Sequence, residues 1–182
     1  MATLRPRPAA PVSMALAPSA ARQVRRREEE RALIEQAIAD PLSRLGNRAA
    51  YEAACIRKEG DRERGERGAV LFIDIDFFKR INDEKGHAAG DRAISEFGKS
   101  IRSTIRTNDE AFRYGGDEFV IILKNMTRAS AELFISKRLR PAFERIGISA
   151  SIGMAEYGKE RSIREAIRHA DDKVKVLKES RR

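Results

Sequence analysis

The order of predicted elements along this chain indicates an α/β domain in which helices flank a central sheet. Residues 69–76, AVLFIDID, are almost continuously apolar, which is typical of a central strand covered on both faces. Residues 147–156 alternate between apolar and polar positions, as a half-buried strand does. Apolar residues at steps of three and four predict an amphipathic helix between these strands: Ile94, Phe97, Ile101 and Ile105.

The chain opens with two segments that do not belong to this domain. Residues 1–20 carry small residues, early arginines and interrupting prolines, so we expect a disordered tail that lacks the apolar core of a signal peptide. Residues 21–39 are strong helix formers with a sparse apolar stripe, and Asp40-Pro41 breaks this helix. The stripe is too short to predict a coiled coil, but the helix is a candidate dimerisation stalk.

Residues 40–182 are predicted to form a single domain. Ser43 and Asn47 can cap a helix that we expect to end near Ile56. The following segment, residues 57–68, is charged and spaced by glycines, which predicts an exposed loop.

The second half of the domain begins with a predicted hairpin, in which residues 112–123 fold around Gly115-Gly116. Residues 129–140 are predicted to be helical, and Pro141 is expected to end or bend that helix. Ser162 is a capping candidate for the last helix. The residues of that helix expected to face inward are Ile163, Ala166, Ile167, Ala170, Val174 and Leu177.

Composition excludes some classes of protein. With 41% hydrophobic and 36% charged residues, the chain has a globular profile, and no apolar run approaches the roughly 20 residues of a membrane span. We therefore expect a cytoplasmic protein without membrane contact. The single cysteine, Cys55, excludes an intramolecular disulfide and is predicted to be a small core residue.

The net charge of +9 lies at the two ends of the chain, with 13 basic and 7 acidic residues over residues 137–182. This excess is either a solvated helix face or a patch that faces phosphates. No aromatic residues are interleaved with it, so a surface on which nucleic-acid bases stack is not favoured.

Acidic residues end two of the predicted strands. Asp74 and Asp76 are separated by two positions and point to the same face, and Asp117 and Glu118 lie at the mouth of an apolar strand. If the hairpin packs beside the first strand, these carboxylates meet at one edge of the sheet. Such a cluster is unstable unless a cation lies within it, and hard oxygen ligands without histidine or thiolate suit Mg²⁺ or Mn²⁺. The alternative is an ordinary acidic turn.

Two segments resemble the GGDEF family of bacterial diguanylate cyclases: DIDFFKRINDEKGHAAGD (residues 74–91) and RYGGDEF (residues 113–119). Two more are similar to its opening turn and its late strand: DPLSRLGNRAAYE (residues 40–52) and SIGMAEY (residues 151–157). The family makes cyclic di-GMP from two GTP molecules on a palm-like fold shared with adenylyl cyclases and polymerases. The resemblance therefore implies this fold and activity, and a homodimer in which each domain presents one GTP.

The resemblance also implies a role for each matching acidic residue. Asp74 and Asp117 correspond to metal-binding carboxylates, with the Ile75 carbonyl as a further ligand, in a site for two Mg²⁺ or Mn²⁺ ions. Glu118 corresponds to a residue beside the reacting phosphate that helps the metals to activate the 3′-hydroxyl. The implied reaction is attack of the 3′-hydroxyl of one GTP on the α-phosphate of the other, with release of pyrophosphate.

The implied GTP site has a part that recognises guanine and a part that holds phosphates. Asn82 and Asp91 match the guanine-recognising pair, because an amide and a carboxylate can together satisfy the base edge. The other residues, which make room for GTP or contact its phosphates, are Gly115, Gly116, the backbone N–H groups of Phe77 and Phe78, Lys79, Lys178 and Arg182. The chain departs from the family at Lys175, where a Tyr is usual, and at Arg181, where a Gly is usual.

Arg106 and Asp109 match the family's Arg-x-x-Asp inhibitory site for cyclic di-GMP, with five residues between Asp109 and Gly115. An arginine pairs bidentately with phosphate or guanine, and a carboxylate accepts from guanine N–H groups. Arg138 is the candidate third contact, with Lys137 as the alternative if the alignment shifts by one residue.

Two other functions remain open from the sequence. The first is a catalytically silent cyclic di-GMP receptor acting through Arg106 and Asp109, and the intact motif together with Asn82 and Asp91 argues against it. The second is a basic module that binds RNA or DNA. His87 is expected to be a buried histidine that hydrogen-bonds the backbone rather than a general base.

Overall fold

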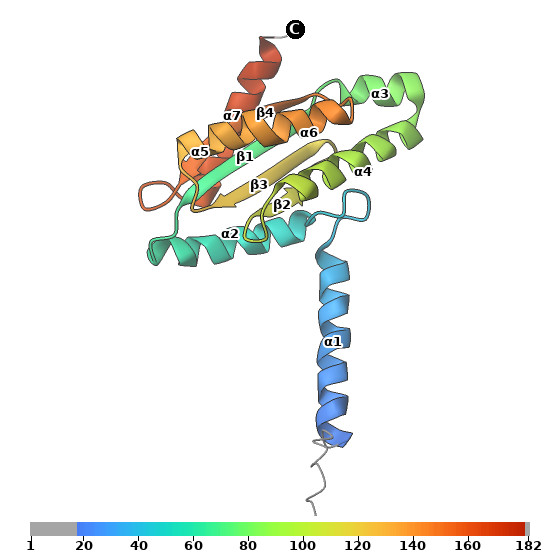
Figure 1. The fold of residues 1–182 in the computed structure, drawn as a ribbon, viewed down its shortest axis with the longest axis vertical. Helices are drawn as coiled ribbons and strands as arrows, with labels where there is room; N and C mark the ends of the chain where they lie inside the picture. The colour runs from blue at the N-terminus through green and yellow to red at the C-terminus, as the bar shows by residue number, and fades with distance from the viewer. Residues whose placement is uncertain (1–17, 181–182) are drawn as a thin grey trace, which may run out of the picture. The chain divides into compact units, whose positions relative to one another are not determined.

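The computed structural model describes residues 18–180 (Figure 1). Residues 1–17, which make up most of the expected disordered tail, lie outside this range, as does Arg182. The chain divides into two units, Met1–Ala37 and Ile38–Arg182, and each is described by itself. None of the helices within the described residues combines the length and apolar composition needed to cross a membrane.

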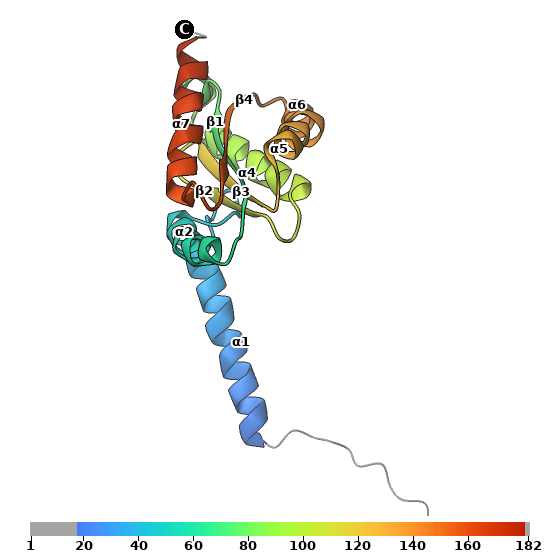
Figure 2. The same cartoon turned by 90° about the vertical axis from the view of Figure 1, so that its left-hand side faces the viewer.

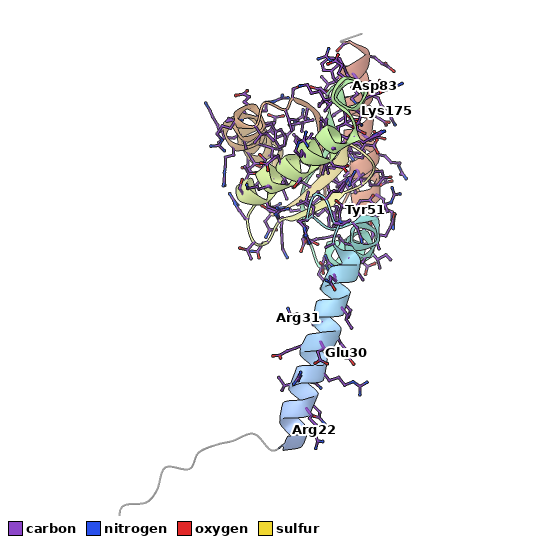
Figure 3. All side chains as sticks on the ribbon, turned by 90° about the vertical axis from the view of Figure 1, so that its right-hand side faces the viewer. Arg22, Glu30, Arg31, Tyr51, Asp83 and Lys175 are labelled. Carbon is purple, nitrogen blue, oxygen red and sulfur yellow. The ribbon has the colours of Figure 1, made fainter. Side chains whose placement is uncertain are left out.

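The first unit contains helix α1, Pro18–Ile38, which confirms the helix predicted over residues 21–39 but begins earlier. Its apolar residues Val24, Leu33 and Ile34 are exposed. Figure 3 shows side chains projecting away from the axis of α1. Pairs of Arg and Glu four residues apart, such as Arg25–Glu29 at 3.0 Å, add about 0.3–0.5 kcal/mol each to the helix.

The second unit is built on a four-stranded sheet in the order β2-β3-β1-β4, in which all paired strands are antiparallel. The central strand β1, Gly68–Ile75, lies between β3, Glu118–Lys124, and β4, Ala150–Tyr157, while β2, Glu110–Arg113, forms the edge. This arrangement confirms the three strand regions predicted from the sequence. All of β1 is buried except Asp74, as expected of a strand covered on both faces.

Helices cover both faces of the sheet (Figure 2). One face of β1, which carries Leu71 and Ile73, packs in a cluster with α4, His87–Thr104, and α6, Arg140–Arg145. The other face, which carries Val70 and Phe72, packs in a second cluster with α2, Arg48–Glu63, and α7, Ile163–Glu179. The alternation of side chains along β1 therefore divides the core into two layers.

Helix α2 is longer than predicted, because residues 57–63 continue the helix instead of forming an exposed loop. The reason is a tertiary contact, which the charged composition of this segment does not indicate. Lys58 is buried, and its ammonium group lies 2.5 Å from the Glu66 carboxylate, so this turn of the helix packs against the domain. Cys55, on the same helix, is fully buried, which confirms its prediction as a core residue.

Two other helical regions differ from the prediction. The single helix expected after β1 is two helices, because Gly86, at φ 78°, separates α3, Phe78–Lys85, from α4. Pro141 does not end its helix. Helical conformation continues from α5, Arg128–Phe134, through the π-helix η1, Ile135–Leu139, into α6, and Pro141 lies in the first turn of α6.

The last helix, α7, begins as predicted. Ser162 accepts a hydrogen bond from the Glu165 backbone N–H, and the Glu165 side chain accepts from the Ser162 backbone, which completes a capping box. The predicted inward-facing residues are buried, apart from Leu177, which is half-buried.

Candidate active site

Two adjacent strands bring carboxylates together at one end of the sheet. Asp74, near the end of β1, lies directly opposite Glu118, the first residue of β3. The Ile75 N–H donates a hydrogen bond of 3.2 Å to the backbone oxygen of Asp117. The structure therefore produces the meeting of acidic strand ends that the sequence predicts.

The carboxylates in this cluster oppose one another's ionisation. Burial raises the pKa of Glu118, and the nearby charges of Asp74 and Asp117 raise it further. Burial likewise raises the pKa of Asp74, and this outweighs the opposing effect of Lys178. Since the charged forms are disfavoured by desolvation and by mutual repulsion, a cation would stabilise the cluster.

One cation of the chain itself reaches this cluster. Lys178, on α7, forms an ion pair with Asp74 Oδ1, and the Asp74 side chain is only 13% exposed. Within residues 18–180, Asp74 Oδ1 has no other polar partner. A buried carboxylate oxygen with a single ionic contact retains capacity to coordinate a cation.

The donor set fits a hard divalent metal ion of the Mg²⁺ type. Its members are carboxylate oxygens and strand-end carbonyls, with neither histidine nor cysteine. No three His, Cys, Asp or Glu side chains in the described part of the chain converge closely enough to hold a metal by themselves.

The turn between β2 and β3 explains the two adjacent glycines. A Cβ at Gly115 would collide with the carboxylate of Glu118, so only glycine allows that side chain to lie where it does. Gly116 faces open space, so no contact within the domain requires glycine there, and its carbonyl oxygen accepts hydrogen bonds from Arg113.

Arg113 ties this turn to a distant part of the domain, a role that the sequence analysis did not assign. Its Nε and Nη2 donate to the Gly116 oxygen at 3.0 and 2.7 Å, and its Nη1 lies 3.3 and 3.2 Å from the two oxygens of Asp40. Asp40 also accepts from the Ser43 N–H at 2.7 Å. Arg113 and Asp40 both lie in segments that resemble the GGDEF family, residues 113–119 and 40–52. The sequence therefore contained both residues, but neither segment indicates that they pair.

Beside the carboxylates, the chain makes an elbow, residues 76–78, between β1 and α3. Phe77 adopts left-handed backbone angles, φ 59° and ψ 26°, which cost a bulky residue about 1–2 kcal/mol. Its side chain is 58% exposed, and among the described residues no side chain caps the start of α3 there. The first N–H groups of α3, together with the exposed Lys79, therefore lie at the same end of the sheet as the carboxylates.

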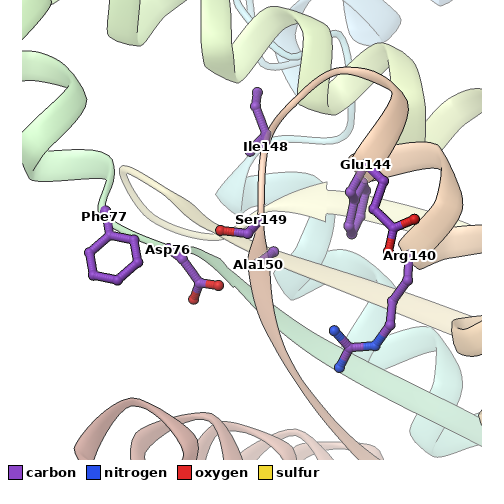
Figure 4. A pocket seen from close by; sticks show the side chains of 8 residues that line it. Asp76, Phe77, Arg140, Glu144, Ile148, Ser149 and Ala150 are labelled. Carbon is purple, nitrogen blue, oxygen red and sulfur yellow. The ribbon is translucent and has the colours of Figure 1, made fainter. Parts of the chain in front are cut away.

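Asp76 anchors this elbow to β4. Its N–H donates to the Ser149 oxygen at 2.9 Å, and its Oδ1 accepts a hydrogen bond of 2.7 Å from the Ser151 hydroxyl. Asp76 and Phe77 also border a pocket of about 330 Å³, which Figure 4 shows. The lining residues are Asp76, Phe77, Arg140, Phe143, Glu144, Ile148, Ser149 and Ala150.

Comparison with known proteins identifies the family. The family model described as "Diguanylate cyclase, GGDEF domain" matches residues 37–182, which is most of the chain. The chain belongs to the GGDEF domain family. The palm-like fold implied by the sequence resemblance is thereby confirmed.

The relatives share most of this chain. It is 35% identical over 153 residues to "Diguanylate cyclase DgcS" of Shewanella oneidensis, an alignment that covers 81% of this chain and 51% of that protein. It is 41% identical over 129 residues to "Diguanylate cyclase A" of Treponema denticola, covering 65% of this chain and 34% of that protein. The chain thus spans about half the length, or less, of these curated relatives.

Solved structures show the same fold. The coiled coil and GGDEF domain of DgcB from Caulobacter crescentus, in complex with c-di-GMP, superposes with a TM-score of 0.76 at 25% identity. The match covers 89% of this chain and 91% of that one. The structural match therefore extends beyond the two motif segments, residues 74–91 and 113–119.

The two residues expected to recognise guanine lie on neighbouring helices of the GGDEF domain. Asn82, on α3, is half-buried against Gly90, where a Cβ would collide with the Asn82 amide oxygen. Asp91, the next residue of α4, is exposed. The structure thus places the amide and the carboxylate at one junction of two helices.

His87 does not match its prediction. It is exposed at the first position of α4, so the expectation of a buried histidine was wrong. The turn at Gly86 starts a new helix there, and the first residue of that helix faces solvent rather than the core.

The residues expected to form an inhibitory site lie away from the carboxylates, in the GGDEF domain's α4–β2 turn and on η1. Asp109 is buried, and its oxygens accept from the backbone N–H groups of Arg106 at 3.0 Å and Lys124 at 3.2 Å. The Arg106 side chain is exposed, as is Arg138, whose guanidinium lies 5.9 Å from the centre of the Phe134 ring. Asp109 therefore shapes the turn that presents Arg106.

Proposed function

We propose that this GGDEF domain is a diguanylate cyclase, which condenses two GTP molecules into cyclic di-GMP with release of pyrophosphate. The observation that carries the proposal is the carboxylate cluster at the ends of β1 and β3, beside an uncapped helix start and the ammonium group of Lys178. Since GTP is the substrate, we place the domain in the cytoplasm. The names of its relatives support the same activity.

Two Mg²⁺ or Mn²⁺ ions would be held by Asp74, Asp117 and the Ile75 carbonyl, where they would neutralise charge on the phosphates and polarise the reacting groups. Asp74 and Asp117 come from neighbouring strands, so the sheet itself fixes their separation. Mg²⁺ bound by one or two carboxylates completes its coordination with water and substrate oxygens, so GTP itself would supply the remaining ligands.

Glu118 would act on the attacking hydroxyl. Burial and neighbouring carboxylates raise its pKa, which makes it a stronger base than an isolated glutamate. In the proposed step, the 3′-oxygen of one GTP bonds to the α-phosphorus of the other, and the bond to pyrophosphate breaks. The proton of the 3′-hydroxyl passes to Glu118.

The phosphates and the base of GTP would lie on opposite sides of α3. The backbone N–H groups of Phe77 and Phe78 and the side chain of Lys79 would bind the phosphates, because uncapped N–H groups at a helix start attract anions. Asp91 would accept hydrogen bonds from the N–H groups of guanine, and the Asn82 amide would donate to an acceptor on the same base. Gly115 and Gly116 would leave room for the nucleotide, and Lys178 and Arg182 would neutralise its charge.

A single domain binds one GTP, so two copies must face each other. We infer that α1 pairs with its counterpart in a second copy, because Val24, Leu33 and Ile34 are apolar and exposed on a helix that is marginal alone. The similar DgcB structure includes a coiled coil. Cyclic di-GMP would inhibit the dimer by binding at Arg106, Asp109 and Arg138.

The activity is tested by incubating the chain with GTP and Mg²⁺ and resolving the products by mass. We expect cyclic di-GMP, and we expect Asp74→Ala and Asp117→Ala to abolish its formation with the fold intact, a loss of several kcal/mol in transition-state stabilisation, roughly a hundredfold or more. Glu160→Ala is the matched control, an exposed acidic residue beyond the opposite end of β4. Turnover by both Asp variants within about threefold of wild type would refute the metal assignment.

A further inference from the structure

We propose that Ser151 and Asp76 are positioning residues, which hold the elbow of residues 76–78 in the shape that binds the GTP phosphates. This inference rests on the proposed function. Neither side chain needs to touch GTP, because the hydrogen bond between them acts on the backbone of Phe77. The hydroxyl of Ser151 is the donor and Asp76 Oδ1 the acceptor, at 2.7 Å.

The elbow needs an external constraint because its own sequence disfavours its shape. Phe77 has φ 59°, a value that a bulky side chain rarely adopts and that persists only where the surroundings impose it. The Phe77 side chain is only partly packed, and its ring lies 4.8 Å from the guanidinium of Arg80, which belongs to the helix that follows the elbow. The Phe77 ring is more than half exposed, and the pocket in Figure 4 borders both Asp76 and Phe77.

The constraint comes from β4. Pairing of β1 with β4 ends at Ile75 and Ala150, and the bond from Asp76 N–H to the Ser149 oxygen extends it by one residue. Ser151 is fully buried within β4, in the register position opposite Asp74, yet its hydroxyl donates to Asp76. The two hydrogen bonds clamp Asp76 to the strand, so the chain leaves the sheet at the next residue, Phe77, from a fixed starting point.

This clamp sets the direction of the first N–H groups of α3. When a ligand binds only one backbone conformation, its apparent dissociation constant rises as fewer molecules adopt that conformation. Weakening the clamp should therefore weaken the binding of GTP without slowing the reaction of bound GTP, which raises KM and leaves kcat unchanged. A general loss of folding would do the reverse, because it lowers the concentration of active enzyme.

The test compares Ser151→Ala with two other variants. Asp76→Asn keeps the oxygen that accepts from Ser151, so hydrogen exchange at the elbow should match that of wild type. Ser149→Ala is the matched control, since the Ser149 side chain is exposed and its hydroxyl has no hydrogen bond among the described residues. For each variant we would measure kcat and KM for GTP and the affinity for a non-hydrolysable GTP analogue by calorimetry. We would also measure amide hydrogen exchange at Asp76 and Ile81, whose N–H groups donate to the backbone oxygens of Ser149 and Phe77.

Loss of one buried hydrogen bond should raise KM and the dissociation constant of Ser151→Ala about tenfold, with kcat within about twofold. Exchange at Asp76 and Ile81 should become faster in this variant alone. Combining it with Phe77→Gly, which adopts the left-handed turn without strain, should reduce the penalty.

Three results would overturn the inference: unchanged affinity in Ser151→Ala, a fall in kcat with unchanged KM, or inactivity of Asp76→Asn, which would make Asp76 a metal ligand. Failure of the proposed function looks different, because wild type itself would then bind no GTP analogue or form no cyclic di-GMP. In that event the exchange measurement still decides the elbow, since unchanged exchange in Ser151→Ala would show that the clamp does not hold it.

Discussion

Replacing Arg113 by methionine should lower both the stability and the activity of the domain, because one guanidinium joins the turn around Asp40 to the turn around Gly116. Methionine keeps most of the apolar stem and removes the charge and the donors. The two bonds to the Gly116 oxygen, at 3.0 and 2.7 Å, and the pair with Asp40, at 3.2 Å, are lost together.

The magnitude follows from the burial of the pair. The side chains of Arg113 and Asp40 are 17% and 15% exposed, so the pair lies between a surface ion pair, at 0–1 kcal/mol, and a broken buried pair, at about 3–5 kcal/mol. We expect a loss of about 2–3 kcal/mol in the free energy of unfolding, or about 5–10 °C in Tm for a chain of this size. Release of the Gly116 carbonyl should also cost about ten- to a hundredfold in kcat/KM.

The pH dependence provides a second readout. Burial by itself would raise the pKa of Asp40, but hydrogen bonds from Ser43 and the charge of Arg113 hold this pKa below its ordinary value of 3.8. A depressed pKa means that the stabilisation is present above pH 3.8 and is lost as the pH falls through the lower, folded value. The difference between wild type and Arg113→Met should therefore shrink below that pH.

Urea unfolding followed by circular dichroism measures the change, and a double-mutant cycle with Asp40→Asn should give a coupling energy of about 0.5–3 kcal/mol. Arg168→Met is the control, since Arg168 is an exposed arginine of α7 with no polar partner among the described residues. A loss below about 0.5 kcal/mol, the range of neutral surface substitutions, with unchanged turnover would refute the reasoning.

Four further predictions follow from individual contacts. Gly153→Ala places a Cβ against a backbone oxygen of α7 and should cost about 1–3 kcal/mol in unfolding free energy, whereas Gly60→Ala, in open space on α2, should stabilise by about 0.5–1 kcal/mol. Because the folded pKa of Glu118 is raised above 4.5, its charge destabilises the fold at neutral pH, so Glu118→Gln without divalent cations should raise Tm by about 2–4 °C, an effect that disappears below pH 4.5. Calorimetry should show that Arg106→Ala abolishes cyclic di-GMP binding at the inhibitory site; unchanged binding there would exclude that site. Deleting residues 1–37 should make specific activity fall and depend steeply on protein concentration, because pairing through α1 supplies an effective concentration of about a millimolar; equal activity per site at low concentration would show that α1 does not pair.

Much of the end of the sheet that carries the carboxylates could be predicted from the sequence. The apolar run of β1, the hairpin around Gly115-Gly116 and the cap at Ser162 all depend on patterns within a few residues, and the structure contains each of them. The meeting of Asp74 with Glu118 was also predictable, because two adjacent strands that end in acidic residues have one edge to share. The sequence is therefore enough to predict that acidic side chains meet where these two strands end.

Other features depended on partners far away in the chain. Composition indicated a loop where Lys58 is buried in α2, because nothing near it in the sequence announces the pairing with Glu66. The prediction that His87 is buried was also wrong, because the break between α3 and α4 leaves His87 exposed. In both places the tertiary contacts overrode the local pattern.

The two clamps at the catalytic end show the limit most clearly. Arg113 and Asp40 are 73 residues apart, and Ser151 and Asp76 are 75 apart. Each side chain alone is an ordinary polar residue with several available partners, so the sequence by itself determined where strands, turns and acidic residues occur, but not which groups bond. Only the tertiary structure decided that, because the sheet order β2-β3-β1-β4 sets distant backbone segments at hydrogen-bonding distance.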